Sequence, residues 1–233
     1  MDGKIKIAID VMGGENSPDK TLEGISLFTK RYKKKDDYFF YIFGDIDKIN
    51  RKIKKFSNLK SNYQIIDTKI VVADDLSALS AIKKGKNSSM WECINSQISL
   101  NTDVSLSAGN TGVLLVMSKM ILKTLEGIDK PALAGLWPNN KNMNVVLDLG
   151  ANVECNDKNL VDFSEMGSAL YKSIFPEEEP KVALLNIGLE EIKGTETLKN
   201  AYSKLKILDQ YGDFKFNGYI EGNHITDGDS NVI

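Results

Sequence analysis

Four polar, glycine-bearing segments of this sequence each follow directly after an apolar run. They occupy residues 10–15, 107–112, 148–152 and 186–194. In an open parallel sheet, ligands bind at the carboxyl ends of the strands, so segments that follow strands meet at one edge. The sequence therefore predicts that these four loops converge on one rim and that the chemistry lies there.

The loop Ser-Ala-Gly-Asn-Thr-Gly at 107–112 is the most informative of the four, because it opens directly onto an apolar helical pattern. The first N–H groups of a helix have no intrahelical partner and favour an anion. We therefore expect Asn110, Thr111 and Gly112 to bind phosphate, with Lys193 as the nearby cation. The alternative is that Gly109 and Gly112 only shape a turn and that Asn110 or Thr111 only caps the helix.

The other loops offer supporting groups. Asp10 and Asp148 are carboxylates at the ends of predicted strands, where each either orients lysines and other donors or serves as a cap or turn carboxylate. The remaining supporting residues are Gly13, Gly14 and Asn186. Neither of the two arginines, Arg31 and Arg51, lies in these loops, so an anion site must use backbone N–H groups and lysine.

Several familiar chemistries lack their residues. The first predicted strand is followed by only two glycines, so the dinucleotide fingerprint is missing, and the phosphate-loop and nucleophile-elbow patterns are missing as well. The single histidine, His224, lies far from the loops in sequence and is expected at the surface or rim. Cys93 and Cys155 have no metal-ligand spacing and are expected to be free buried thiols. We therefore expect chemistry without a covalent enzyme intermediate, a metal or a cofactor.

Composition places the chain among ordinary globular proteins. It has 30 basic and 32 acidic residues, a formal net charge of −2, and 42% hydrophobic residues. This balance excludes a protein that coats nucleic acid through bulk positive charge. The start resembles no signal peptide and no apolar run is long enough to span a bilayer, so we expect a soluble, cytoplasmic protein.

Apolar runs alternate with amphipathic stretches along the chain, which is typical of a doubly wound α/β fold with a mostly parallel sheet. Strands are predicted over 5–11, 38–43, 64–66, 70–72, 104–107, 132–137, 145–149, 182–187 and 214–220. Helices are predicted over 18–34, 46–57, 76–84, 88–100, 112–125, 157–171 and 196–208, with Pro18 at the first helical position. No repeat or linker divides the chain, so residues 1–233 are expected to form a single α/β domain.

The loops and several further motifs resemble the bacterial phosphate acyltransferases, the PlsX family, in family order over essentially the whole chain. The matching strings are AIDVMGG at 8–14, NSSM at 87–90, SAGNTG at 107–112, GIDKPA at 127–132, LDLGANV at 147–153, EMGS at 165–168, LLNIG at 184–188 and KG at 193–194. The resemblance implies a three-layer α/β/α sandwich related to the phosphate acetyltransferase and isocitrate dehydrogenase-like fold.

The resemblance also implies a function. It implies transfer of a long-chain acyl group from acyl carrier protein to inorganic phosphate, giving acyl phosphate for phospholipid synthesis. A homodimer, peripheral association with the membrane and association with a glycerol-phosphate acyltransferase are the expected assembly and partners. In the expected mechanism, phosphate attacks the thioester carbonyl directly. Lys193 balances the phosphate charge, Asn152 donates to the carbonyl oxygen, and Asp10 orients its neighbours.

This sequence departs from the family in three places. Glu15 stands where the family usually has aspartate, and Lys130 stands where it usually has arginine. The family also continues beyond this sequence through another glycine-rich loop, so the chain is expected to lack the family's C-terminal third. A chain of these residues alone is expected to pair or aggregate through an apolar sheet face or edge left uncovered at the last predicted strand, 214–220, and to transfer acyl groups weakly. Two alternatives stay open: a short-chain phosphate acyltransferase that uses acyl-CoA, and a catalytically impaired or non-catalytic binding form.

Overall fold

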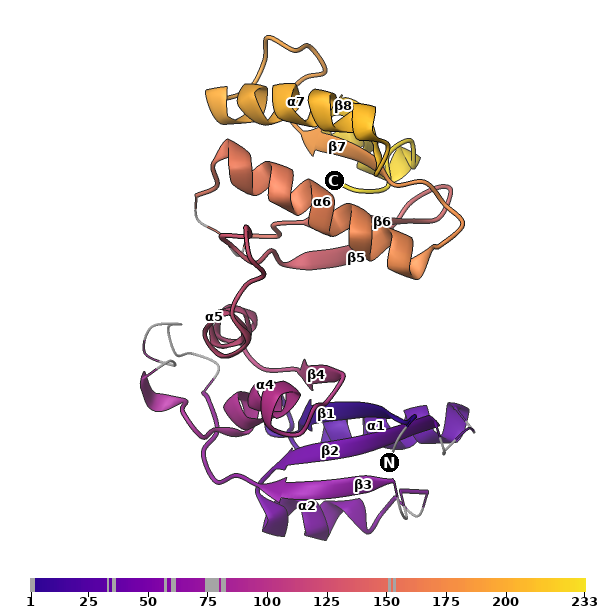
Figure 1. Ribbon diagram of the computed structural model, residues 1–233. Helices are drawn as coiled ribbons and strands as arrows, with labels where there is room; N and C mark the ends of the chain where they lie inside the picture. Colours follow the sequence, from indigo (N-terminus) through magenta and orange to yellow (C-terminus); the bar gives the residue numbers. More distant parts are fainter. Residues whose placement is uncertain are drawn as a thin grey trace. The chain divides into compact units, whose positions relative to one another are not determined.

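The computed structural model describes residues 3–32, 34, 37–56, 58–59, 62–73, 80, 83–150, 152 and 154–233. Contacts between Cα atoms divide the chain into two compact units, Met1–Lys123 and Thr124–Ile233 (Figure 1). Each unit has its own strands, covered by its own helices, and each is described separately. The expectation of a single domain over 1–233 stays a prediction.

The first unit is built on a parallel sheet in the strand order β3-β2-β1-β4. Its elements, in chain order, are β1 (Ile5–Asp10), α1 (Asp19–Arg31), β2 (Tyr38–Gly44), α2 (Ile46–Ile53), β3 (Tyr63–Asp67), α4 (Ser89–Ser99), β4 (Val104–Ser107) and α5 (Thr111–Leu122). The predicted alternation of parallel strands and helices is confirmed here, with most boundaries within a few residues of the expected ones.

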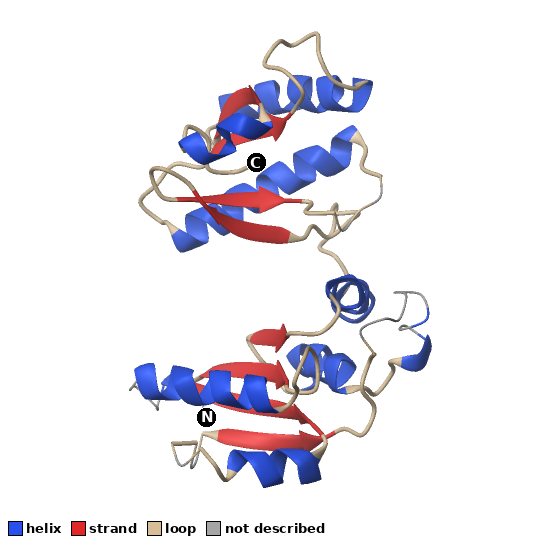
Figure 2. Cartoon of the chain, turned by 180° about the vertical axis from the view of Figure 1, so that it is seen from behind, coloured by secondary structure: helices blue, strands red, loops and turns tan. Residues whose placement is uncertain are grey.

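Side chains alternate between the two faces of this sheet, and both faces are buried by helices. Ile9 and Ile42 pack with Leu22 of α1 and Ile49 of α2 on one face. Ala8, Tyr41 and Phe43 pack with Cys93 of α4 on the other face. The first unit is therefore three-layered, and Figure 2, which views the chain from behind, shows helices on both sides of its strands.

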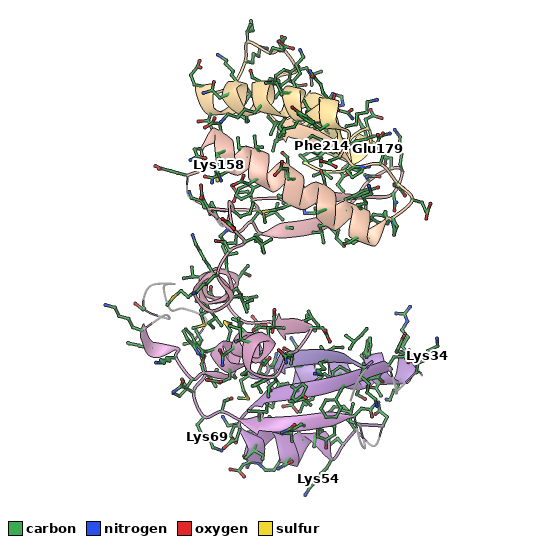
Figure 3. The ribbon with its side chains drawn as sticks, in the orientation of Figure 1. Lys34, Lys54, Lys69, Lys158, Glu179 and Phe214 are labelled. Carbon is green, nitrogen blue, oxygen red and sulfur yellow. The ribbon has the colours of Figure 1, made fainter. Side chains whose placement is uncertain are left out.

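The second unit contains β5 (Ala134–Pro138), β6 (Met143–Leu147), α6 (Asp157–Ile174), β7 (Lys181–Leu185), α7 (Glu196–Leu208) and β8 (Lys215–Ile220), with 3₁₀ turns at Asp209–Tyr211 and Gly222–Asp227. β7 and β8 are parallel, whereas β5 and β6 are antiparallel. Val145, Val182 and Leu205 belong to its core, together with Phe214, which is labelled in Figure 3.

A short segment at 231–233 joins the two strand pairs of the second unit. Val232 forms parallel bridges with both Val145 of β6 and Val182 of β7. The Leu147 N–H donates to the Ile233 carbonyl at 2.8 Å, and the Ala183 N–H donates to the Val232 carbonyl at 2.9 Å. These residues thus lie between β6 and β7 in one mixed sheet, although three residues carry too little periodicity to predict a strand.

Three local expectations differ from the structure. Pro18 is the N-cap of α1 and not its first helical residue. The strand expected over 70–72 is reduced to one bridge between Ile70 and Ser88, because Ser88 is the N-cap of α4 and the chain turns into that helix. The helix expected over 76–84 lies largely outside the described residues. Among the described residues, no helix is both long and apolar enough to cross a membrane.

Candidate active site

A buried carboxylate, Asp10, joins the loops that follow β1 and β4. It is 1% exposed, and its Oδ1 accepts hydrogen bonds from the N–H groups of Met12 (3.1 Å) and Gly13 (3.2 Å). Its Oδ2 accepts from the Ser107 hydroxyl at 2.7 Å, and the Ser107 oxygen accepts in turn from the Gly109 N–H at 3.1 Å. Asp10 is therefore a turn carboxylate in its own loop and also holds the Ser107 hydroxyl of the other loop, while its expected part in the chemistry stays a prediction.

Two glycines allow these loops to approach each other closely. A Cβ atom on Gly13 would lie 2.7 Å from Asp10 Oδ2 and 2.9 Å from the Gly109 nitrogen. Gly14 has a φ of +83°, and a Cβ atom there would lie 2.6 Å from the Ala108 carbonyl oxygen. Any other residue would push the two loops apart, so both glycines support the site through their size.

The joined loops border a cavity of about 320 Å³ at the start of α5. It is lined by Gly14, Glu15, Ala108, Gly109, Asn110, Thr111 and Gly112. The Asn110 side chain caps α5 by accepting from the Val113 N–H at 3.0 Å, and its expected role in binding phosphate stays a prediction. Within the described residues, no hydrogen bond uses the N–H of Thr111 or Gly112.

This cavity can therefore receive an anion, because two helix N-terminal donors and the helix dipole favour negative charge there. The Glu15 carboxylate lines the same cavity and opposes an anion. The expectation that Lys193 is the cation of a phosphate site stays a prediction.

In the second unit, Asp148 organises the loop that follows β6. Its Oδ1 accepts from the backbone N–H of Asn152 (3.3 Å) and from the Asn152 amide (2.9 Å), and its Oδ2 accepts from the Cys155 thiol (3.2 Å). The Asn152 amide nitrogen also donates to the Pro131 carbonyl at 3.1 Å. Both amide hydrogens of Asn152 are thus engaged, and its expected donation to a substrate carbonyl requires one of them to be released. Ala151 and Val153 lie outside the described residues.

The loop before this one is tied to α6 by Lys158, which is labelled in Figure 3. Its Nζ donates to the Gly127 carbonyl at 2.6 Å and pairs with Asp129 (3.2 Å) and Asp162 (2.9 Å). The neighbouring Lys130, which replaces the family's usual arginine, donates to the Glu154 carbonyl at 2.6 Å. A single ammonium satisfies that contact, so the bidentate geometry of arginine is not needed for it.

Lys193 lies in a compact loop after β7. Asn186 holds this loop, because its amide nitrogen donates to the Lys193 carbonyl at 3.2 Å and its Oδ1 accepts from the Ile187 N–H at 2.9 Å. Gly194 packs against Asn186 with a φ of +91°. The half-exposed Lys193 ammonium pairs with Glu190 at 3.1 Å and is accessible to solvent.

The structure brings together the loops at 10–15 and 107–112 in the first unit, whereas those at 148–152 and 186–194 belong to the second. Convergence of all four on one rim stays a prediction. Sequence analysis assigned no role to Ser107 or Cys155. The position of Ser107 at the end of a predicted strand could have indicated its role, because the register of β1 and β4 pairs it with Asp10. No pattern in the sequence pointed to the contact of Cys155.

The two thiols differ in burial, since Cys155 is only partly buried although both were expected to be buried. Cys93 is buried, and burial followed by the nearby Asp10 charge raises its pKa to about 12. Burial and the Asp148 carboxylate raise the pKa of Cys155 to about 11. His224 is an exposed residue whose pKa is raised by its 2.7 Å hydrogen bond with Asp227. Among the described residues, no cluster of three or more His, Cys, Asp or Glu side chains is placed to hold a metal ion.

The sequence matches one protein family and relatives that share one name. The model of a family described as "Fatty acid synthesis protein" matches residues 5–233. The phosphate acyltransferase of Pelagibacter ubique is 54% identical over 229 residues, which cover 98% of this chain and 67% of that protein. The phosphate acyltransferase of Azorhizobium caulinodans is 38% identical over all of this chain and 65% of its own length. The chain thus spans about two thirds of the length of these relatives.

Among solved structures, the EutD phosphotransacetylase from Staphylococcus aureus matches with a TM-score of 0.61 and 16% identity, over 98% of this chain and 76% of that one. A branched-chain phosphotransacylase from Enterococcus faecalis matches with a TM-score of 0.51 and 13% identity, over 98% of this chain and 78% of that one. At such identities the likeness concerns the fold, and it agrees with the predicted α/β class.

Proposed function

We propose that this chain transfers a long-chain acyl group from acyl carrier protein to inorganic phosphate. The chain belongs to the fatty acid synthesis protein family, and its relatives are phosphate acyltransferases. The observation that carries this proposal is the identity of 54% to a phosphate acyltransferase over nearly the whole chain. The glycine-lined cavity at the start of α5 supports it, because it offers an anion site with unused N–H donors.

In the proposed reaction, phosphate lies in that cavity with its oxygens on the N–H groups of Thr111 and Gly112. An oxygen of hydrogen phosphate attacks the thioester carbonyl carbon, a C–O bond forms, and the C–S bond breaks as the thiolate leaves and takes the proton that the hydrogen phosphate gives up. Positioning lowers the barrier, because the nucleophile and the carbonyl are held in contact. Asp10 is a positioning residue here, since it acts through the two loops that it joins.

The negative charges of phosphate and of the carbonyl oxygen in the intermediate need groups that stabilise them. We propose that Lys193 balances the phosphate charge. Asn152 stabilises the carbonyl oxygen of the intermediate once its amide is released from Asp148 or Pro131. Until then Asn152 and Asp148 hold the shape of their loop. This division of roles predicts that Lys193 affects the use of phosphate, whereas Asp148 affects the geometry of the loop.

The assembly and location belong to the same proposal. We propose a cytoplasmic homodimer with peripheral attachment to the membrane and association with a glycerol-phosphate acyltransferase, which would consume the acyl phosphate. The resemblance to the family supports these proposals. They are tested by the oligomeric state of the purified chain and by its co-sedimentation with vesicles of phosphatidylglycerol and phosphatidylethanolamine.

The decisive experiment measures acyl phosphate, trapped with hydroxylamine, after incubation with palmitoyl-acyl carrier protein and phosphate. Lys193→Ala is expected to raise the KM for phosphate about ten- to a hundredfold, since a charge-assisted contact contributes about 1.5–3 kcal/mol. Lys199→Ala is the matched control, because Lys199 also pairs with a glutamate three residues before it, Glu196, at 3.5 Å. Equal phosphate kinetics in the Lys193 and Lys199 variants would refute the role of Lys193.

The same assay separates the alternatives. Acyl phosphate formed from acetyl- or butyryl-CoA in preference to palmitoyl-acyl carrier protein would identify a short-chain phosphate acyltransferase. Binding of acyl carrier protein and phosphate with no trapped product from either thioester would identify a non-catalytic binding form.

A further inference from the structure

An apolar groove of about 580 Å³ runs between α1 and the sheet of the first unit, along β1 and β4. Thr21, Gly24 and Phe28 of α1 line one wall, and they succeed one another at spacings of three and four residues, so they form a stripe along one helix face. Ile9 and Leu106 of the sheet line the opposite wall.

The groove is continuous with the cavity at the start of α5. Gly14, Glu15 and Ala108 line both of them. A molecule whose reacting group lies beside a phosphate in that cavity therefore has the mouth of the groove directly next to it. Continuity of this kind favours a ligand with one polar and one apolar end.

The lining of the groove suits an unbranched apolar chain. Its charged residues are Asp10, whose carboxylate accepts three hydrogen bonds, and Glu15 and Lys20. The rest of the wall is mainly aliphatic and aromatic, and Leu106 (50% exposed) and Phe28 (42% exposed) present apolar surface to solvent. Covering that surface with methylene groups removes it from water, which favours binding.

Gly24 adds no side chain to the wall of the groove. A glycine in the interior of a helix destabilises that helix relative to alanine. A Cβ atom built on Gly24 would meet no heavy atom within 4 Å, so the space beside this lining residue is open. A larger side chain at this position would project into that space without displacing a neighbour.

We propose that this groove holds the acyl chain of the substrate, with the thioester carbonyl at its mouth beside the phosphate cavity. The inference rests on the proposed function, because it takes the acyl thioester as the ligand. It places the determinant of chain length on α1, at Gly24 and Phe28, and not in the loops that hold phosphate.

The test compares binding of S-dodecanoyl- and S-butyryl-pantetheine by titration calorimetry, which needs no turnover. Gly24→Leu is expected to lower the ratio of dodecanoyl to butyryl affinity about tenfold or more, because two or more methylenes lose their contacts. Gly24→Ala is expected to lower it less, and it serves as the milder variant should leucine impair folding. Glu23→Leu is the matched control, since it adds the same side chain at an exposed neighbouring position outside the groove.

Each outcome of this binding experiment either supports or overturns the proposal that the groove holds the acyl chain. A ratio unchanged in both Gly24 variants overturns the proposal. An unchanged ratio together with a shift in the sedimentation of Gly24→Leu shows that the groove seats a second copy of the chain, which also overturns it. A ratio that falls while the wild-type chain forms no acyl phosphate supports the groove and refutes the catalytic function, so the two failures are distinguishable.

Discussion

Among the described residues, the groups that donate hydrogen bonds to the Asp148 carboxylate come from its own loop. Asp148 accepts from Asn152 and from the Cys155 thiol, and its backbone has a φ of +57°, which non-glycine residues seldom adopt. The thiol must stay protonated to donate to a carboxylate. Burial and Asp148 both act in that direction and raise the pKa of Cys155 to about 11.

This contact predicts the reactivity of Cys155 towards alkylation. In a Cys93→Ser background, Asp148→Asn removes the negative charge, so the pKa of Cys155 is expected to fall from about 11 towards the ordinary thiol value. Because the thiolate is the nucleophile, its alkylation by iodoacetamide at pH 8 is expected to become several-fold faster. Mass spectrometry measures the rate, with Glu154→Gln as the control. A rate that does not change on loss of the Asp148 charge would contradict the contact.

The α5 helix is the element on which the anion site depends. Asn110 caps it and satisfies the Val113 N–H, while the N–H groups of Thr111 and Gly112 face no partner among the described residues. A Cβ atom on Gly112 would lie 3.4 Å from the Asn110 Oδ1, at the limit of ordinary contact. The helix therefore tolerates alanine at position 112, where a methyl group would lie in the wall of the cavity at the start of α5.

Gly112→Ala separates phosphate binding from stability. Its methyl group enters the wall of the cavity at the start of α5, so phosphate affinity in titration calorimetry is expected to fall about tenfold or more. The melting temperature is expected to stay the same or rise, since alanine favours a helix over glycine by up to about 1 kcal/mol. Ser118→Ala, on the same helix, serves as the control. Wild-type phosphate affinity in Gly112→Ala would exclude the start of α5 as the anion site.

At the scale of the whole molecule, β5 is an exposed sheet edge. Among the described residues it pairs only with β6, and it presents Leu136 (48% exposed) and Trp137 (42% exposed) to solvent. An edge strand with large apolar side chains is a template for pairing with another chain. The expected homodimer and the expected self-association both need a surface of this kind.

We therefore predict concentration-dependent self-association through β5, measured by sedimentation velocity across a wide range of concentrations. Trp137→Lys is expected to shift the chain towards monomer, because a lysine on an edge strand opposes pairing between strands. Ile207→Lys is the matched control, since it places the same charge at an exposed apolar position of α7. Monodisperse monomer in the wild-type chain at all concentrations, or equal effects of the two lysines, would contradict the role of β5.

The sequence by itself determined the features that depend on local pattern. Continuous apolar runs such as 145–147 and 182–185 indicated strands, because β-strands covered on both faces need no polar side, although the strand that contains 145–147 pairs antiparallel with β5. The loop at 107–112 indicated the start of α5 and a cap at Asn110 or Thr111, since capping involves residues only three apart. The motifs in their order also identified the family, which the comparisons then showed.

Only the tertiary structure decided which side chains meet. Asp10 and Ser107 are separated by 97 residues, and their hydrogen bond exists because β1 and β4 are neighbours in the sheet. The engagement of Asn152 by Pro131 and the insertion of 231–233 between β6 and β7 likewise join segments far apart in sequence. Periodicity reports which face of an element is apolar, whereas contacts between distant elements depend on how those faces pack. For that reason the loops could be identified from the sequence, but the partners of their side chains could not.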